Sequence, residues 1–223
     1  MAMTDTSKPS AGGSRPIRAS GEGVTSDRQA AFTVPGMERS DATMVIEILG
    51  DRLVGLLDLQ ATLKHVHWNV VGPGFIGVHE MLDAMTAGVV PLVDQTAERI
   101  ATLGGSPNGL PGHLVAQRTW DDYDVHRATV DAHLAALDLV YDGLIADARD
   151  SIDAVESLDV VSHDLLVGHA AVLEQQHWFV RAHLEDPAGG LSNAGATTEL
   201  DAATKATNRH RSDRPRPATG SES

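Results

Sequence analysis

The chain contains no cysteine, and aromatic residues make up only 4% of its 223 residues. The absence of cysteine excludes a disulfide framework and any thiolate metal site, so a bound metal would have nitrogen and oxygen ligands. The N-terminal region lacks the apolar core of a signal peptide, and no uninterrupted apolar run reaches the roughly 18 residues of a membrane-spanning helix. We therefore expect a soluble, cytoplasmic protein without a membrane partner.

Positive charge is also scarce, since the formal net charge is −14 at pH 7. A surface of this sign repels phosphate, which argues against non-specific nucleic-acid binding by the folded body. Any contact with DNA must therefore be local. If the chain encloses a cavity, the same charge would concentrate cations inside it.

Composition divides the chain into three parts. Residues 1–35 are rich in Ser, Gly, Pro and Thr and lack apolar periodicity, which predicts a disordered N-terminal arm. Residues 36–187 have the length and apolar content of one domain. Residues 188–223 are again polar, which predicts a flexible C-terminal tail with a weak helical tendency over 197–207.

Apolar residues recur at helical spacing in four stretches of the central domain. They predict helices over 40–70, 75–103, 121–155 and 159–185, with almost no strand signal. Gly72 and Gly74 end the first helix and Gly104 ends the second. Residues 106–119 form a longer crossover with a short helical piece near 112–117. The predicted fold class is all-α, a ferritin-like four-helix bundle with a short helix between its second and third helices.

Four potential metal ligands lie in the second predicted helix: His79, Asp83, Asp94 and Glu98. At about 100° per residue they cluster within roughly 100° of arc, so they share one helix face. At 1.5 Å rise per residue, however, the first pair lies roughly 22 Å from the second pair. One chain cannot bring both pairs to the same metal ion.

The two pairs are symmetric about a point next to Gly88, which indicates a two-fold axis. If two copies of this helix cross antiparallel near Gly88, the first pair of one copy faces the second pair of the other. His67, near the end of the first helix, lies one short turn from this site. A glycine at the crossing leaves room for close approach.

Imidazole and carboxylate ligands suit iron, zinc or manganese better than calcium or copper(I). The spacing alone does not choose among these metals. Such pairs are also common on solvated helix faces, which is the alternative interpretation. Glu174 and His177 form one ExxH motif of the type that binds iron in di-iron bundles. Such a site needs a second ExxH motif, which the chain lacks, so we interpret this pair as incidental and not as a metal site.

The C-terminal tail carries a run of basic residues that would suit non-specific binding to the phosphate backbone of DNA. Its residues are Lys205, Arg209, Arg211, Arg214 and Arg216. The alternative is a solvated tail that only maintains solubility.

The run KHVHWNVVG over 64–72, the ligand spacing and the run RTWDDY over 118–123 together resemble the Dps family of mini-ferritins. The resemblance covers roughly residues 32–186 and is strongest to actinobacterial members. It implies a hollow homododecamer with an iron-oxidation centre across each two-fold interface. His67, His79 and Asp83 would come from one subunit, and Asp94 and Glu98 from its partner.

The resemblance also implies a ferroxidase that oxidises Fe(II), preferably with hydrogen peroxide, stores the Fe(III) mineral and protects DNA from oxidative damage. Trp68, next to His67, becomes a candidate for electron transfer with a reactive intermediate, although packing is the default role of a large aromatic residue. The implied location is the cytoplasm, with association with the nucleoid. Two alternatives remain open: a nucleoid-structuring DNA-binding protein, or a mini-ferritin cage without DNA binding.

Overall fold

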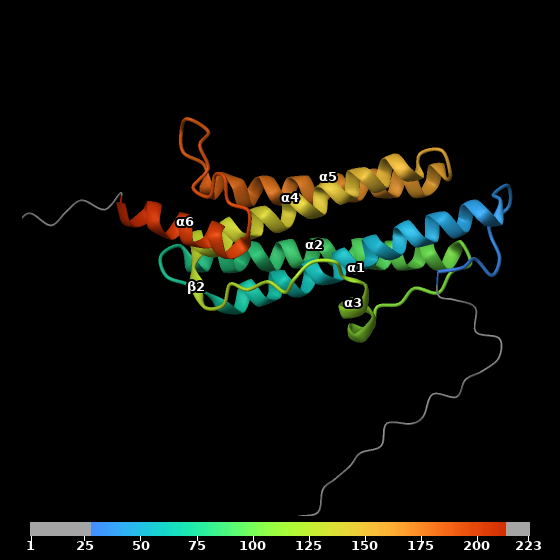
Figure 1. Ribbon diagram of the computed structural model, residues 1–223, viewed down its shortest axis with the longest axis horizontal. Helices are drawn as coiled ribbons and strands as arrows, with labels where there is room; N and C mark the ends of the chain where they lie inside the picture. The colour runs from blue at the N-terminus through green and yellow to red at the C-terminus, as the bar shows by residue number, and fades with distance from the viewer. Residues whose placement is uncertain (1–27, 213–223) are drawn as a thin grey trace, which may run out of the picture.

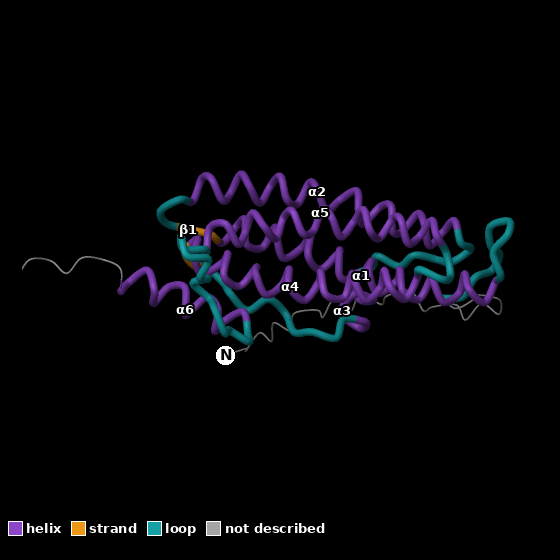
Figure 2. The backbone as a smooth tube through the Cα atoms, turned by 90° about the horizontal axis from the view of Figure 1, so that it is seen from above, coloured by secondary structure: helices purple, strands orange, loops and turns teal. Residues whose placement is uncertain are grey.

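The structure is a computed structural model that describes residues 28–212, and four long helices dominate it (Figure 1). They are α1 (Arg39–Asn69), α2 (Phe75–Thr102), α4 (Val130–Val155) and α5 (Val160–Leu184). They lie side by side along one axis in Figures 1 and 2, with α1 packed on α2 and α4 packed on α5. The predicted all-α bundle is confirmed, as is the short crossover helix, α3 (Pro111–Gln117).

Glycine and aspartate end the helices close to the predicted positions. Gly72 and Gly74 adopt φ values of 94° and 79° in the turn between α1 and α2, and Gly104 adopts 88° after α2. Glycine tolerates these left-handed conformations because it has no Cβ atom. Asp159 caps α5, because its carboxylate accepts a hydrogen bond from the backbone N–H of Ser162 at 3.0 Å.

The third long helix begins later than the sequence predicts, at Val130 instead of residue 121. The preceding segment is held against α1, where Asp58 accepts hydrogen bonds from Arg118 at 3.1 Å and from the Trp120 indole at 2.8 Å. Just before α4, β2 (Ala128–Thr129) pairs in parallel with β1 (Val70–Val71), which directly follows α1. These long-range contacts override the local preference for helix.

A buried polar link joins α2, α4 and α5. The Tyr141 hydroxyl donates to Gln176 Oε1 at 2.8 Å, and Gln176 Nε2 donates to the Met85 carbonyl at 3.0 Å. A Cβ atom on Gly88 would lie 2.7 Å from Gln176 Nε2, so glycine makes room for the link. The sequence explains Gly88 by a crossing with a second copy, whereas the structure gives this glycine a close neighbour inside the chain.

Residues 28–35 pack against the end of α2, in contrast to the disordered arm that the sequence predicts over 1–35. Ala30 is buried, and the Ala31 N–H donates to the Gly104 carbonyl at 2.9 Å. Residues 1–27 lie outside the described part of the chain. The folded unit therefore starts before the predicted boundary at residue 36.

The C-terminal region differs from the predicted flexible tail over 188–223 as far as it is described. Helix α6 (Glu199–Ser212) packs on α4 at the end of the bundle where β1 lies (Figure 2). Its buried residues are Ala202, Ala203 and Ala206. Alanine lets two helices approach closely, and the weak apolar signal of this small residue hides the packing face from sequence patterns. Residues 213–223 lie outside the described part.

Helix α2 carries an exposed apolar face. Its most apolar window of 18 residues has a mean hydropathy of 1.3, and 28% of that window is buried. By length and composition alone, this helix could cross a membrane. Ile76 and Val90 are 62% and 47% exposed. A second protein surface that covers this face would remove the same apolar area from water.

Glu199, in the first turn of α6, makes the docking of this helix sensitive to pH. Its pKa is raised to about 7, mainly by burial and also by the nearby carboxylates of Asp58 and Asp124, while one backbone hydrogen bond opposes the rise. A raised pKa adds stability that is complete below the unfolded value near 4.5 and is lost as pH rises through 7.

We therefore expect Glu199→Gln to increase the free energy of unfolding at pH 8 by about 1–2 kcal/mol, after discounting for solvent screening, and to change it little at pH 5. Urea unfolding at both pH values measures this. Glu47→Gln, on the exposed face of α1, is the matched control. An equal effect of Glu199→Gln at the two pH values would contradict the prediction.

Candidate metal centre

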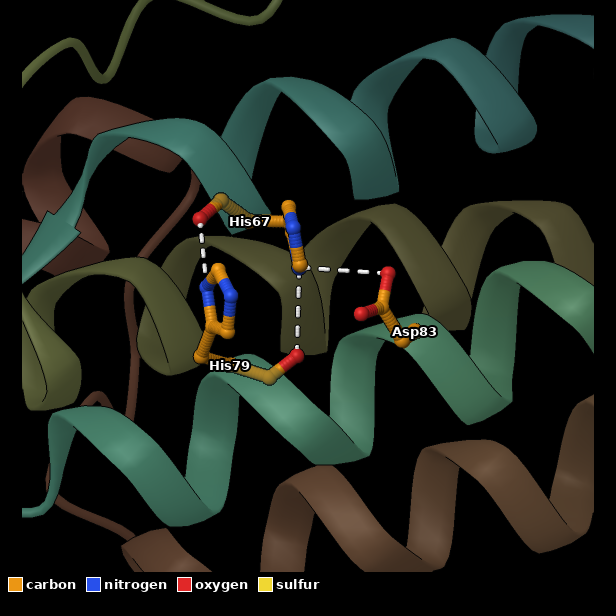
Figure 3. A group of neighbouring side chains, drawn as sticks. All are labelled: His67, His79 and Asp83. Carbon is orange, nitrogen blue, oxygen red and sulfur yellow. Dashed lines mark hydrogen bonds and ion pairs between the residues drawn. The ribbon is translucent and has the colours of Figure 1, made fainter.

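Three of the predicted ligands meet where the end of α1 lies beside the start of α2 (Figure 3). His67 comes from the last turn of α1, and His79 and Asp83 are one turn apart on α2. One potential ligand atom of each lies within 4.8 Å of the others. In the part of the chain that the structure describes, this is the one group of three or more His, Cys, Asp or Glu residues so arranged.

The two imidazole rings hold each other in place through the backbone. Nδ1 of His67 donates to the His79 carbonyl at 3.1 Å, and Nδ1 of His79 donates to the His67 carbonyl at 3.1 Å. The rings are stacked, with centroids 3.7 Å apart. Because each Nδ1 carries a proton, each neutral ring keeps its Nε2 lone pair for a metal ion. His67 is 8% exposed, so its ring is also confined by packing.

Asp83 lies at the open side of the group. Its Oδ1 atom accepts a hydrogen bond from Lys64 Nζ at 2.9 Å and lies 3.4 Å from His67 Nδ1. The hydrogen bond from Lys64 lowers the pKa of Asp83. Desolvation partly opposes this effect, and the nearby histidines lower the pKa further. This carboxylate is therefore ionised at neutral pH.

Asp94 and Glu98 lie further along α2 and are exposed. They do not join the group of three in the same chain. The rise of α2 places Asp94 roughly 22 Å from His79, as the sequence predicts. A single chain thus holds one half of the predicted ligand set together, and the contribution of the other half from a second subunit remains a prediction.

Trp68 follows His67 and is 72% exposed, so it does not pack in the core of this chain. Glu174 and His177 have other partners: Glu174 pairs with Arg149 at 2.5 Å, and His177 Nε2 lies 2.8 Å from Asp138 Oδ1. Neither belongs to the group of three potential metal ligands. This arrangement agrees with the interpretation that the ExxH pair is incidental.

Two of the predicted DNA contacts have partners inside the chain. Lys205 Nζ lies 2.9 Å from Asp201 and donates to the Gly195 carbonyl at 2.8 Å. Arg209 pairs with Asp186 at 2.6 Å. Arg211 lies on α6, but its side chain is not described, and Arg214 and Arg216 lie outside the described residues.

Lys64 is the residue near the metal centre that sequence reasoning missed. It precedes His67 by three positions, which places both side chains on one face of α1. Its Nζ atom lies 5.9 Å from the centroid of the Trp68 ring as well as 2.9 Å from Asp83. The i, i+3 spacing from His67 is the signal that would have identified it.

Comparison with known proteins gives consistent matches. The family model described as a ferritin-like domain matches residues 46–188. The DNA protection during starvation protein of Mycolicibacterium smegmatis is 57% identical over 176 residues, which cover 79% of this chain and 96% of that protein. A solved structure of Mycobacterium smegmatis Dps has a TM-score of 0.73 at 57% identity, and covers 74% of this chain and 100% of its own. DpsA14 from Streptomyces coelicolor has a TM-score of 0.72 at 51% identity, with coverages of 76% and 98%.

Proposed function

Because this chain belongs to the Dps family of ferritin-like proteins, we propose that it is a ferroxidase and iron-storage protein that protects DNA in the cytoplasm. It oxidises Fe(II), preferably with hydrogen peroxide, and stores the Fe(III) mineral in a cage. The observation that carries this proposal is the half-site of His67, His79 and Asp83, in which two oriented imidazoles and one ionised carboxylate converge. This donor set suits Fe(II).

The centre is completed in a homododecamer by the partner subunit's Asp94 and the partner subunit's Glu98. The exposed apolar face of α2 supports this arrangement, because Ile76 and Val90 lie on the same helix as the carboxylates and would be buried by an antiparallel copy. A two-fold operation then produces two equivalent centres per pair of subunits.

The chemistry follows from this ligand set. Two Fe(II) ions each lose one electron, and one hydrogen peroxide molecule takes both electrons and two protons to give two water molecules. The carboxylates stabilise the rise in charge from Fe(II) to Fe(III), while the imidazoles hold Fe(II) without adding charge. Trp68, exposed beside His67, can donate an electron to a reactive oxidant. Removing Fe(II) and peroxide together protects DNA.

The direct experiment measures Fe(II) oxidation by the full-length protein with hydrogen peroxide and with dioxygen, alongside its mass in solution. We expect a faster rate with peroxide than with dioxygen, and the mass of twelve subunits. A rate equal to that in buffer alone would contradict the ferroxidase proposal, and a monomeric mass would contradict the shared centre.

We also propose non-specific DNA binding through the C-terminal basic residues. Ion pairs on α6 limit what two of these residues can add to the affinity for DNA. Lys205 must separate from Asp201, and Arg209 from Asp186, before either contacts phosphate. The release of each side chain from its carboxylate lowers the affinity that Lys205 and Arg209 can contribute.

Substitution of all five basic residues of the tail by Gln should weaken DNA binding, and substitution of Lys205 and Arg209 alone should weaken it less. A gel shift at several salt concentrations measures this, and the salt slope should fall by about 0.9 for each phosphate that the variant no longer neutralises. Equal weakening by the two variants would place the whole contribution on Lys205 and Arg209 and contradict the prediction.

The two alternative functions are separated by the same measurement. The absence of any salt-sensitive shift with the full-length protein would select a cage without DNA binding. DNA binding without Fe(II) oxidation would select the nucleoid-structuring protein.

A further inference from the structure

The ammonium group of Lys64 is paired with the carboxylate of Asp83, which a metal ion in the half-site would bind. Its Nζ atom lies 2.9 Å from Asp83 Oδ1, the same oxygen that lies 3.4 Å from His67 Nδ1. Figure 3 shows this carboxylate turned toward His67. The lysine is therefore a cation built into the half-site.

The position of this ammonium group is restrained from two sides. Asp83 on α2 accepts its hydrogen bond, and the Trp68 ring on α1 lies 5.9 Å from Nζ. A cation at this distance is attracted to the electron-rich face of an indole. The Lys64 side chain is 31% exposed, so its stem is largely covered while its head remains near the open side of the site.

The lysine changes the charge that an approaching metal ion meets. Asp83 contributes one negative charge and Lys64 contributes one positive charge, whereas an imidazole ring that binds a metal ion is uncharged and contributes none. In one chain the half-site is thus electrically neutral, and the negative charge of the completed centre comes from the partner subunit's Asp94 and the partner subunit's Glu98. What the half-site itself adds to the attraction for a divalent cation must therefore come from bonds to the imidazole nitrogens. Mg²⁺ and Ca²⁺ prefer oxygen ligands and gain little from imidazole, whereas Fe(II), Co(II) and Zn(II) bind imidazole well.

We propose that Lys64 is a specificity-determining residue of the metal centre. Its positive charge excludes cations, such as Mg²⁺ and Ca²⁺, that bind carboxylates but gain little from imidazole. The ammonium group neutralises Asp83 until an ion that also bonds His67 and His79 displaces it. This inference rests on the proposed function, because it assumes that the half-site belongs to a metal centre. It assigns Lys64 an effect on metal choice, separate from the oxidation step.

The test is the binding of Co²⁺ to the assembled full-length protein, with and without a large excess of Mg²⁺. Calorimetry gives the dissociation constant, and the visible spectrum of Co²⁺ reports nitrogen coordination. In the parent protein, we expect Mg²⁺ to change the apparent Kd for Co²⁺ by less than about twofold. In Lys64→Met, which keeps the length of the side chain, Co²⁺ should bind about threefold to tenfold more tightly, and Mg²⁺ should compete measurably.

Two further variants isolate the charge of Lys64. Lys64→Arg keeps the positive charge and should restore the insensitivity to Mg²⁺. Arg149→Met removes an exposed positive charge on α4 that forms an ion pair with Glu174 on α5. This variant should bind Co²⁺ as the parent does. This control accounts for the change in net charge of the whole protein.

The outcomes separate this inference from the proposed function. If His67→Ala abolishes Co²⁺ binding but Lys64→Met behaves as the parent does with Mg²⁺, the metal centre stands and the role of Lys64 is overturned. Sensitivity of Lys64→Arg equal to that of Lys64→Met would also overturn it. If the parent binds no Co²⁺ through His67, both proposals are overturned.

Discussion

Replacement of His67 and Glu98 together by alanine should slow Fe(II) oxidation by hydrogen peroxide about a hundredfold or more, without loss of helix content or assembly. His67 is the most enclosed ligand of the half-site, at 8% exposed, and Glu98 lies on an exposed face of α2. The double variant therefore removes one ligand from each half of every proposed centre. A hundredfold loss corresponds to about 2.7 kcal/mol of transition-state stabilisation. Stopped-flow absorbance of Fe(III) measures the rate.

Glu80→Ala is the matched control, because Glu80 is an exposed acid next to His79 on the same helix and is not among the proposed ligands. It should oxidise Fe(II) at the parent rate. Oxidation at the parent rate by an assembled double variant would refute the proposed centre.

A mixing experiment examines whether the centre is shared. Protein containing only His67→Ala subunits, or only Glu98→Ala subunits, has no intact centre. When the two are unfolded and reassembled together in equal amounts, half of the pairs are mixed, and each mixed pair has one intact centre. We therefore expect about a quarter of the parent rate to return. No recovery in the mixed assemblies would contradict a centre that two subunits share.

The second large effect is expected for Gly104→Ala, which should lower the free energy of unfolding by about 3–5 kcal/mol. Gly104 has a φ of 88°, and a Cβ atom there would lie 2.2 Å from the Phe32 carbonyl oxygen. This oxygen belongs to the backbone of the segment that packs on the end of α2. The alanine variant therefore combines backbone strain with a clash that a side-chain rotation cannot relieve.

Gly72→Ala separates these two causes. Gly72 has a φ of 94°, but a Cβ atom there would meet nothing within 4 Å. Its destabilisation should be limited to the backbone strain, about 1–2 kcal/mol. Urea unfolding of both variants measures the difference, and equal destabilisation would show that the clash with Phe32 has no energetic effect.

Local signals predict much of the fold and half of the metal centre. The glycines at 72, 74 and 104 and the cap at Asp159 mark helix ends through backbone conformation and hydrogen bonding, which depend on a few adjacent residues. The spacing of His79 and Asp83 fixes a shared helix face in the same way. Such features need no knowledge of the rest of the chain.

The features that the sequence does not reveal depend on contacts between distant residues. The late start of α4 follows from the hydrogen bonds of Arg118 and Trp120 to Asp58, some 60 positions away. The docking of α6 relies on alanines, whose weak apolar signal does not mark a packing face. The ion pair of Lys64 with Asp83 joins two helices. These pairings become visible only when the helices are placed together.

The reciprocal bonds of the two histidines also tie the end of α1 to the start of α2. Each Nδ1 is already committed to a backbone carbonyl, at 3.1 Å in both rings. A substitution that shifts either helix would therefore move both rings, because each ring is held by the backbone that carries the other. The orientation of the two imidazole ligands thus depends on the packing of α1 against α2 as well as on the histidines themselves.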